Sequence, residues 1–334
     1  MTNTRSRGAR LAALAAIITL ATTTACSSSG GGKQETTDTS AAGANAAGSS
    51  GYTIAMITHE APGDTFWDKI KAGAQQAAKD TGVTLKYSND PDATKQAVLI
   101  QNAIDSKVNG IATTLVTPDA LAGSVKAATD AGIPLVGFNS GIDQYQELGA
   151  LMYFGSDENL AGSTAGKRIQ AAGAKHPLCA IQAQGSVALE ARCAGVKSII
   201  PATENLQVNG ADDAAVVSTL QAKLAQDKSI DYIVTLGAPI AIDALKAMDQ
   251  ATSTAKLITF DLNAEAAQDI KDGKIEFSID QQPYVQGYMA VTSLYLYLKN
   301  GNDIGGGKAV LTGPSFVDKT NIDKILPFTK NNTR

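Results

Sequence analysis

The feature that most constrains the fold is an internal repeat. Residues 111–139 (IATTLVTPDALAGSVKAATDAGIPLVGFN) and 232–261 (YIVTLGAPIAIDALKAMDQATSTAKLITFD) run side by side with an offset of 120 to 122. Each segment passes from an apolar, strand-like stretch through a proline-led helix to a second strand-like stretch, and they end in Phe-Asn and Phe-Asp. A strand–helix–strand unit that occurs in both halves predicts two similar α/β lobes related by a pseudo-twofold axis.

Strand-like and helix-like segments alternate from residue 52 onwards. The helix expected at 65–80 carries Trp67, Ile70 and Ala74 at helical spacing, and Gly82 lies just past its end. The other expected helices lie at 93–106, 118–130, 187–200 and 240–250, and the expected strands at 52–58, 83–87, 110–116, 133–138, 177–183, 230–236 and 256–260. This alternation predicts an α/β fold of two doubly wound parallel-sheet lobes.

The N-terminus has the pattern of a secretory signal peptide over residues 1–25. Arginines precede an apolar run of about ten residues, which is too short to span a bilayer, and small residues follow it. These features are Arg5, Arg7, Arg10, Leu11–Leu20 and Ala25. Cys26 at the predicted cleavage point resembles the lipidated cysteine of bacterial lipoproteins, although Thr23 stands where Leu or Val is usual. The alternative is an ordinary cleaved signal peptide, and either reading predicts a protein exported across the cytoplasmic membrane.

Residues 26–51 are predicted to form a lipid anchor followed by a flexible linker. The stretch after Cys26 is rich in Gly, Ser, Ala and Thr and has no apolar period, so it cannot build a core. A coil of this length would hold the folded part roughly 25–30 Å from the lipid. The sequence has no second apolar segment long enough to cross a membrane, so Cys26 is the only predicted attachment to it.

Charge and composition narrow the classes of partner. The chain has 334 residues, 44% of them apolar, and a net charge of −4, which becomes −7 when the arginines of the signal peptide are removed. A mildly acidic surface argues against nucleic acid or anionic lipid as the main partner.

Cys179 and Cys193 form an even pair in an oxidising compartment, which predicts a disulfide, with two buried thiols as the alternative.

Signatures of catalysis are missing from the sequence. It contains no glycine-rich dinucleotide or P-loop signature, no GxSxG and no HExxH. Its two histidines, His59 and His176, are far apart, and no Cys/His cluster has metal-ligand spacing. We therefore expect a protein that is not an enzyme and needs no cofactor or metal.

The two lobes predict where a ligand binds. In open α/β sheets, ligands bind beyond the carboxyl ends of the strands. Asn139 and Asp261 follow strand ends in the first and second lobe, and each can make two hydrogen bonds. For Asp261 the alternative is a helix cap.

Further candidates surround these two positions. Phe66 and Trp67 could stack on the C–H face of a sugar-like ligand, although Trp67 also fits the apolar stripe of its helix. Arg192 could donate to vicinal hydroxyls, its alternative being a surface pair with Glu190 or Glu204. The remaining candidates are Asp64 as an acceptor, Gln281 at a strand end before Pro283, His59 at the end of the first strand, and Asn263.

These residues resemble the type I periplasmic sugar-binding proteins of ABC importers, specifically the ribose-binding-protein-like group. The resemblance covers about residues 52–325 and rests on Asp64-Thr65-Phe66-Trp67, Gly137-Phe138-Asn139, Glu190-Ala191-Arg192, Thr259-Phe260-Asp261 and Asp280-Gln281-Gln282-Pro283. It implies that the aromatic pair sandwiches a sugar ring and that Arg192, Asp261 and Gln281 bind its hydroxyls. It also implies a monomer that delivers its ligand to a membrane permease with a cytosolic ATPase.

The same resemblance implies how the chain divides between the lobes. We expect an N-terminal lobe of residues 52–155 with 282–312 and a C-terminal lobe of 156–281 with 313–330, joined by a hinge. The pattern departs from ribose-like members at Asn139-Ser140, where Asp-Arg is common, and at Gly237-Ala238, where an Asn is common. Both changes remove charge or hydrogen bonds, so the predicted ligand is a sugar alcohol or pentose, or a hexose, rather than ribose.

Several alternative functions remain compatible with such a chain. The same fold can serve a sensor that feeds a chemoreceptor or histidine kinase, or a nucleoside-binding lipoprotein, which would need a second aromatic group for the base. An extracellular glycosidase would need two facing carboxylates, and no pair can be nominated. A transcription regulator of similar fold would need an N-terminal helix-turn-helix where this sequence has a signal peptide.

Overall fold

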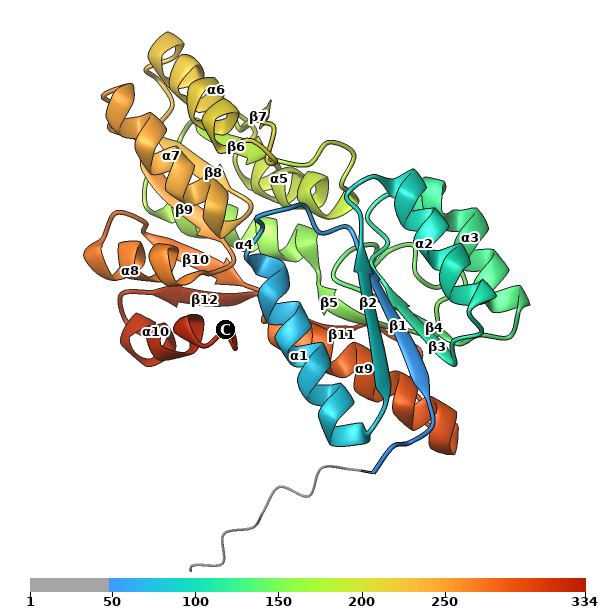
Figure 1. The fold of residues 1–334 in the computed structure, drawn as a ribbon. Coiled ribbons are helices and arrows are strands. Elements are labelled where there is room, and N and C mark those ends of the chain that lie inside the picture. Colours follow the sequence, from blue (N-terminus) through green and yellow to red (C-terminus); the bar gives the residue numbers. More distant parts are fainter. Residues whose placement is uncertain (1–47) are drawn as a thin grey trace, which may run out of the picture. The chain divides into compact units, whose positions relative to one another are not determined.

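Two six-stranded sheets organise residues 48–334, the part of the chain that the computed structural model describes (Figure 1). The predicted signal peptide, Cys26 and most of the predicted linker lie outside these residues. Within the described residues, no helix combines the length and the apolar character that crossing a membrane requires.

The first sheet has the strand order β11-β5-β4-β3-β1-β2, and all of its pairings are parallel. Its strands are β1 (Thr53–Thr58), β2 (Thr84–Asn89), β3 (Gly110–Thr113), β4 (Leu135–Phe138), β5 (Met152–Ser156) and β11 (Val310–Gly313). Four helices cover it: α1 (Phe66–Thr81), α2 (Ala93–Asp105), α3 (Pro118–Asp130) and α9 (Pro283–Asn300). Helix α1 packs on α9 and α2 on α3, and the two pairs lie on opposite faces of the sheet (Figure 1).

The second sheet repeats this order as β12-β10-β9-β8-β6-β7. Its strands are β6 (Pro177–Ile181), β7 (Glu204–Gln207), β8 (Tyr232–Thr235), β9 (Lys256–Phe260), β10 (Phe277–Asp280) and β12 (Ser315–Asp318). Its helices are α4 (Glu158–Ala171), α5 (Val187–Ile199), α6 (Asp213–Gln226), α7 (Ala238–Gln250), α8 (Ala264–Asp272) and α10 (Ile322–Lys330). Edge strand β12 is antiparallel to β10, and the other pairings are parallel. The predicted α/β fold of two similar lobes is confirmed.

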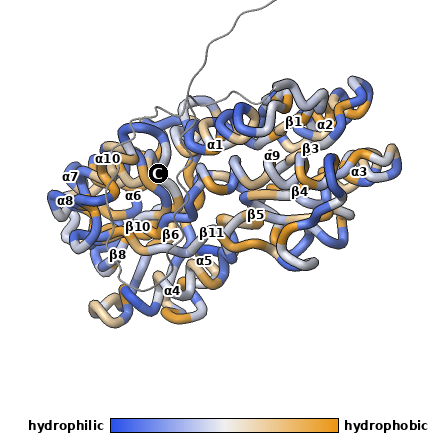
Figure 2. Tube along the Cα trace, turned by 90° about the horizontal axis from the view of Figure 1, so that it is seen from below, coloured by the Kyte–Doolittle hydropathy of each residue, from blue (hydrophilic) through white to orange (hydrophobic). Residues whose placement is uncertain are grey.

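Continuous burial explains why the central strands form where they do. Strands β3, β4, β5, β6 and β8 are buried at every position, as expected for parallel strands covered by helices on both faces. The hydrophobic segments of the tube in Figure 2 include these strands.

Local hydrogen bonds and glycine determine where several helices begin and end. Asp92 and Asp157 accept hydrogen bonds at helix N-termini, and Gly82 ends α1 in a left-handed conformation.

A disulfide joins Cys179 of β6 to Cys193 of α5, with the two Cα atoms 5.8 Å apart. Both cysteines are fully buried in the core between the second sheet and helices α4 and α5. The bridge therefore ties the first strand of this lobe to the helix that carries Arg192.

The chain passes between the sheets three times, and these crossings lie side by side. The first leads from β5 to α4, the second from β10 to α9, and the third from β11 to β12 through the cis peptide bond Gly313–Pro314. Hydrogen bonds join two of the crossings, because Gln282 Nε2 donates to the carbonyl oxygen of Thr312 at 2.6 Å and Gln286 Nε2 to its hydroxyl at 3.1 Å. The ends of β4 and β9 lie next to this region.

Candidate functional site

Asn139 and Asp261 occupy equivalent positions at the ends of β4 and β9. Their backbones adopt the left-handed conformation, with φ of 65° and 63°. Each backbone N–H donates to the neighbouring strand at 2.9 Å, from Asn139 to Phe154 and from Asp261 to Ile279. Residues other than glycine rarely adopt this conformation, Asn and Asp tolerate it best, and such residues cluster at functional sites. The repeat thus places the same unusual backbone at one sheet end in each lobe.

Gln281, in the second crossing, links these two residues. Its Nε2 donates to the two carboxylate oxygens of Asp261 at 3.0 and 3.2 Å, and its Oε1 accepts from Asn139 Nδ2 at 3.3 Å. Gln286 also donates to this oxygen at 2.9 Å. Asn139, Asp261 and Gln281 are 6%, 5% and 3% exposed. Three of the predicted residues therefore form one buried hydrogen-bonded line from the first lobe through the crossing to the second.

Arg192 joins the same cluster from α5, but its main partner is a residue that the sequence analysis missed. Its guanidinium binds Glu158 through Nε at 2.6 Å and Nη2 at 3.0 Å. Nη1 donates to the carbonyl oxygen of Leu236 at 3.0 Å and lies 3.7 Å from Asp261 Oδ2. The surface pairing of Arg192 with Glu190 or Glu204 is thereby excluded, since Arg192 is 3% exposed. Glu158 is the first residue of α4, so in the sequence it looks like an ordinary acidic residue at a helix start.

The aromatic residues Phe66 and Trp67 pack differently from the predicted sandwich. Both belong to the hydrophobic core between the first sheet and helices α1 and α9. Their rings meet edge to face, with centroids 5.2 Å apart and an angle of 86° between the planes. The pair cannot enclose a ligand between two parallel faces, because adjacent helical residues point in different directions.

His59 lies against Trp67 and is neutral. The ring centroids are 4.8 Å apart, and Nδ1 of His59 shares a hydrogen bond of 2.8 Å with the hydroxyl of Thr114. Burial lowers the pKa of His59 to about 3. His59 therefore offers a neutral imidazole at the end of β1.

Asp64 and Asn263 both bind backbone N–H groups, with different consequences. Asp64 Oδ1 accepts from Phe66 N at 3.0 Å, and burial raises the pKa of Asp64. Asn263 is the N-cap of α8, and its Oδ1 accepts from Ala266 N at 2.7 Å. The structure thus gives Asn263 the capping role that was the alternative for Asp261, and it brings Asn263 into no hydrogen bond with the cluster.

Lys69 is a second residue that the sequence analysis missed. Its side chain is buried in α1 at 1% exposure, and its Nζ donates to the carbonyl oxygen of Thr65 at 3.2 Å. Burial lowers the pKa of Lys69, while the nearby carboxylates of Asp261, Asp64 and Asp280 raise it. Because Asp261 follows β9 and Asp280 ends β10 in the second lobe, Lys69 brings a positive charge from the first lobe toward them. Its position between Trp67 and Ile70 carries no sequence signal for this role.

Some buried polar atoms of the described residues have no hydrogen-bond partner. Among them are the hydroxyl groups of Ser140 and Tyr153 and the Oε1 of Gln182. Ser140 follows Asn139, and Gln182 follows β6. Tyr153 lies close enough to Glu158 and Arg192 for their charges to affect its pKa. Unpaired buried groups of this kind lower stability, because their hydrogen bonds to water are lost without replacement.

Two cavities lie on the described part of the chain, and none of the site residues predicted from the sequence lines either of them. A cavity of about 470 Å³ lies between residues 141–144, which follow β4, and the N-terminal parts of α4 and α5, and Glu158 lines it. A second cavity of about 400 Å³ lies at the β10 and β12 edge, beside Arg168 and Phe277. The polar cluster itself is closed, with its side chains bonded to one another.

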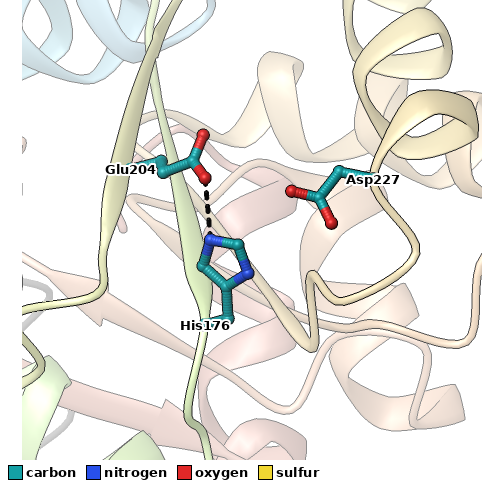
Figure 3. Close-up of side chains that lie close together, drawn as sticks. All are labelled: His176, Glu204 and Asp227. Atoms are coloured by element: carbon teal, nitrogen blue, oxygen red, sulfur yellow. Dashed lines mark hydrogen bonds and ion pairs between the residues drawn. The ribbon is translucent and has the colours of Figure 1, made fainter.

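His176, Glu204 and Asp227 form a separate polar cluster at the edge of the second lobe (Figure 3). His176 Nε2 is 2.8 Å from Glu204 Oε1 and His176 Nδ1 is 2.7 Å from Ser229 Oγ. Lys223 Nζ binds Glu204 at 2.6 Å and lies 3.7 Å from Asp227. An ammonium group already occupies the position between the carboxylates, so the arrangement is that of a satisfied ion-pair network rather than a metal site.

The chain is similar in sequence to a family of known proteins. The periplasmic binding protein domain family matches residues 54–303. The xylose/arabinose-binding protein XylF of Sulfolobus acidocaldarius is 27% identical over 299 residues, covering 82% of this chain and 73% of that protein. The ribose import binding protein RbsB of Haemophilus influenzae is 26% identical and covers 78% of this chain and 89% of that protein.

A solved structure is more similar still. A carbohydrate transporter from Acidothermus cellulolyticus 11B, in complex with myo-inositol, is 56% identical, covering 85% of this chain and 99% of that one with a TM-score of 0.84. The chain belongs to the periplasmic binding protein domain family.

Proposed function

We propose that this protein is an extracytoplasmic solute-binding lipoprotein that captures a small polyol between its lobes and delivers it to an ABC transporter permease. The observation that supports this best is the buried line of Asn139, Gln281 and Asp261, together with Arg192 and Lys69. These groups come from both sheets and the crossing, and they are amide, carboxylate and cationic groups suited to hydroxyls.

The chemistry of the cluster favours an uncharged ligand with many hydroxyl groups. Neutral hydrogen bonds contribute about 0.5–1.5 kcal/mol each and charged ones about 1.5–3 kcal/mol. Six or so such bonds, less the cost of ordering the ligand, correspond to about −8 kcal/mol, or micromolar affinity. The myo-inositol in the 56% identical structure makes a cyclitol the first ligand to test here, followed by pentoses and linear sugar alcohols.

Binding would exchange internal hydrogen bonds for bonds to the ligand. Asn139, Gln281 and Asp261 satisfy one another in the closed cluster, so the lobes must separate for a ligand to reach them. The crossings are the natural hinge, because only a few residues there need to change conformation. The lobes would then close on the ligand, and the closed form would dock on the permease, with the lipid on Cys26 holding the protein at the membrane.

A ligand screen on the exported chain tests this function. The variant Cys26→Ser prevents lipidation, and the melting temperature is measured with myo-inositol, xylose, arabinose, ribose, glucitol and adenosine. A ligand that binds only the native protein raises its melting temperature. We expect a shift with one or more polyols and micromolar dissociation constants by titration calorimetry. A shift with adenosine alone would favour nucleoside binding, and no shift with any polyol would contradict the proposal.

Lys69→Met is expected to weaken polyol binding by about tenfold or more. Among residues 48–334, Thr65 O is the one hydrogen-bond acceptor of the buried ammonium group, which leaves N–H groups for ligand hydroxyls, and charged hydrogen bonds are strong. The change in fluorescence of Trp67, the only tryptophan of the chain, measures the affinity. Lys71→Met is the control, because Lys71 pairs with Glu60 at 2.7 Å and is more exposed. Equal affinities for the two variants would remove Lys69 from the site.

A further inference from the structure

Arg192 and Glu158 form a bidentate ion pair inside the polar cluster, which we call the fork. Two roughly parallel bonds, Nε to Oε2 at 2.6 Å and Nη2 to Oε1 at 3.0 Å, join the two side chains, each of which is 4% exposed. Bidentate pairs of this kind fix the orientation of the guanidinium as well as its charge. The orientation of Arg192 toward Asp261 therefore depends on Glu158.

Two helices hold this fork in place. Glu158 begins α4 directly after the first crossing, and Asp157 caps the helix by accepting from Leu160 N at 2.8 Å. Helix α4 packs closely against α5, so that a Cβ atom at Gly162 would lie 2.0 Å from the carbonyl oxygen of Arg192. Neither partner can move far from the other while the helices stay packed.

The guanidinium still has free donors after these bonds. It carries five N–H groups, of which Glu158 takes two and the carbonyl oxygen of Leu236 takes one. One N–H on Nη1 and one on Nη2 remain for a ligand. Glu158 occupies the edge formed by Nε and Nη2, and its carboxylate cancels the charge of the guanidinium.

We propose, building on the proposed function, that Glu158 determines specificity by occupying the Nε–Nη2 edge of Arg192 and cancelling its charge, so that the site takes uncharged polyols and excludes sugar acids. A buried arginine without a partner strongly favours a ligand carboxylate. With Glu158 in place, the pair offers no net positive charge to a sugar acid, whose carboxylate would also face those of Glu158 and Asp261. A neutral hydroxyl needs only one of the remaining N–H groups and meets no such repulsion.

Glu158→Gln tests this inference, with glucuronate as the acid probe and myo-inositol and xylose as the neutral ones. The measured quantity is the ratio of the dissociation constant of glucuronate to that of the neutral polyol that the unmodified protein binds best. We expect this ratio to fall at least about tenfold in Glu158→Gln, which corresponds to about 1.4 kcal/mol. Glu158→Asn carries the same expectation with a smaller side chain, should the first variant fail to fold.

Two further variants separate this role from a general effect of charge or packing. Glu190→Gln removes an exposed carboxylate from the helix that carries Arg192 and should leave the ratio unchanged. Glu158→Gln combined with Arg192→Gln removes both charges and should abolish the gain in glucuronate binding. An unchanged ratio in folded Glu158→Gln or Glu158→Asn, with polyol binding intact in the unmodified protein, overturns the role of Glu158 and leaves the proposed function standing. No polyol binding by the unmodified protein overturns both.

Discussion

Asp261→Ala is expected to weaken polyol binding at least about a hundredfold while the protein stays folded. Asp261 is the carboxylate at which Gln281 and Arg192 converge, at 3.0 and 3.7 Å, and an ionised carboxylate can accept from two ligand hydroxyls. Two charged hydrogen bonds at about 1.5–3 kcal/mol each correspond to a loss of about 10²–10⁴ in affinity. Titration calorimetry measures the affinity, and circular dichroism verifies the fold. Near-normal binding by a folded Asp261→Ala protein would place the ligand elsewhere.

The same residue predicts how binding and stability depend on pH. Burial raises the pKa of Asp261 from 3.8 to about 7, against the opposing effects of Arg192 and Gln281, with Asp280 and Glu158 adding to the rise. A ligand that needs the ionised form should bind more weakly as the pH falls below about 7, approaching about tenfold per pH unit. Lys69 also lies near this carboxylate, whose charge raises the pKa of Lys69 against the effect of burial.

The same raised pKa predicts the direction in which the free energy of unfolding changes with pH. Between about pH 4 and pH 7 the folded protein holds a proton on Asp261 that the unfolded chain has released, so this residue makes the free energy of unfolding fall as the pH rises through that window. Asp261→Asn removes the titrating group and should flatten the dependence of the melting temperature on pH between 5 and 8. An identical dependence in the variant and the unmodified protein would show that Asp261 has an ordinary pKa.

Gly73→Ala is expected to lower the free energy of unfolding by about 2–3 kcal/mol, a large effect for one methyl group. Helices α1 and α9 touch at this glycine, and its added Cβ would lie 2.0 Å from the backbone oxygen of Tyr284. Because the obstacle is backbone rather than a flexible side chain, the helices must separate, and overpacking of this kind typically costs about 1–3 kcal/mol. Urea unfolding followed by circular dichroism measures the change.

Gly123→Ala is the matched control for this prediction. Gly123 also lies inside a helix, α3, but a Cβ atom there would have no neighbour within 4 Å. The higher helix propensity of alanine should therefore raise the free energy of unfolding by up to about 1 kcal/mol. If the two substitutions change stability in the same direction, close backbone approach is not what requires Gly73.

The repeat of the sequence extends to these helix contacts, which the sequence analysis did not anticipate. In the second lobe, α4 and α5 meet through Gly162 and Gly195 as α1 and α9 meet through Gly73 and Gly287. In the pair formed by α1 and α9, the two helices are far apart in the sequence, because α9 follows the second crossing. The matching contacts show that the two lobes share their packing as well as their strand order.

The local part of the site was predictable from the sequence. Apolar strands and the helices between them follow from short-range periodicity, so the two-lobed α/β fold and the equivalence of Asn139 and Asp261 could be read from the repeat. Gln281 was predicted because it lies where a strand meets Pro283, and Arg192 because it lies early in the first helix of the second lobe. The helix cap that was the alternative for Asp261 belongs to Asn263, since both residues are good caps and only the coordinates show which one accepts from the first turn of α8.

The sequence by itself determined two matched lobes and the sheet ends at which polar residues gather, because strand and helix periods are encoded in neighbouring residues. Only the tertiary structure decided which charges meet there. Glu158 and Arg192 are 34 positions apart, and Asn139 and Gln281 are 142 apart, so nothing in the spacing of either pair marks it. Lys69, Glu158 and Gln286 look like surface residues in the sequence, and they become buried partners only because packed helices and the crossings of the chain bring distant segments together.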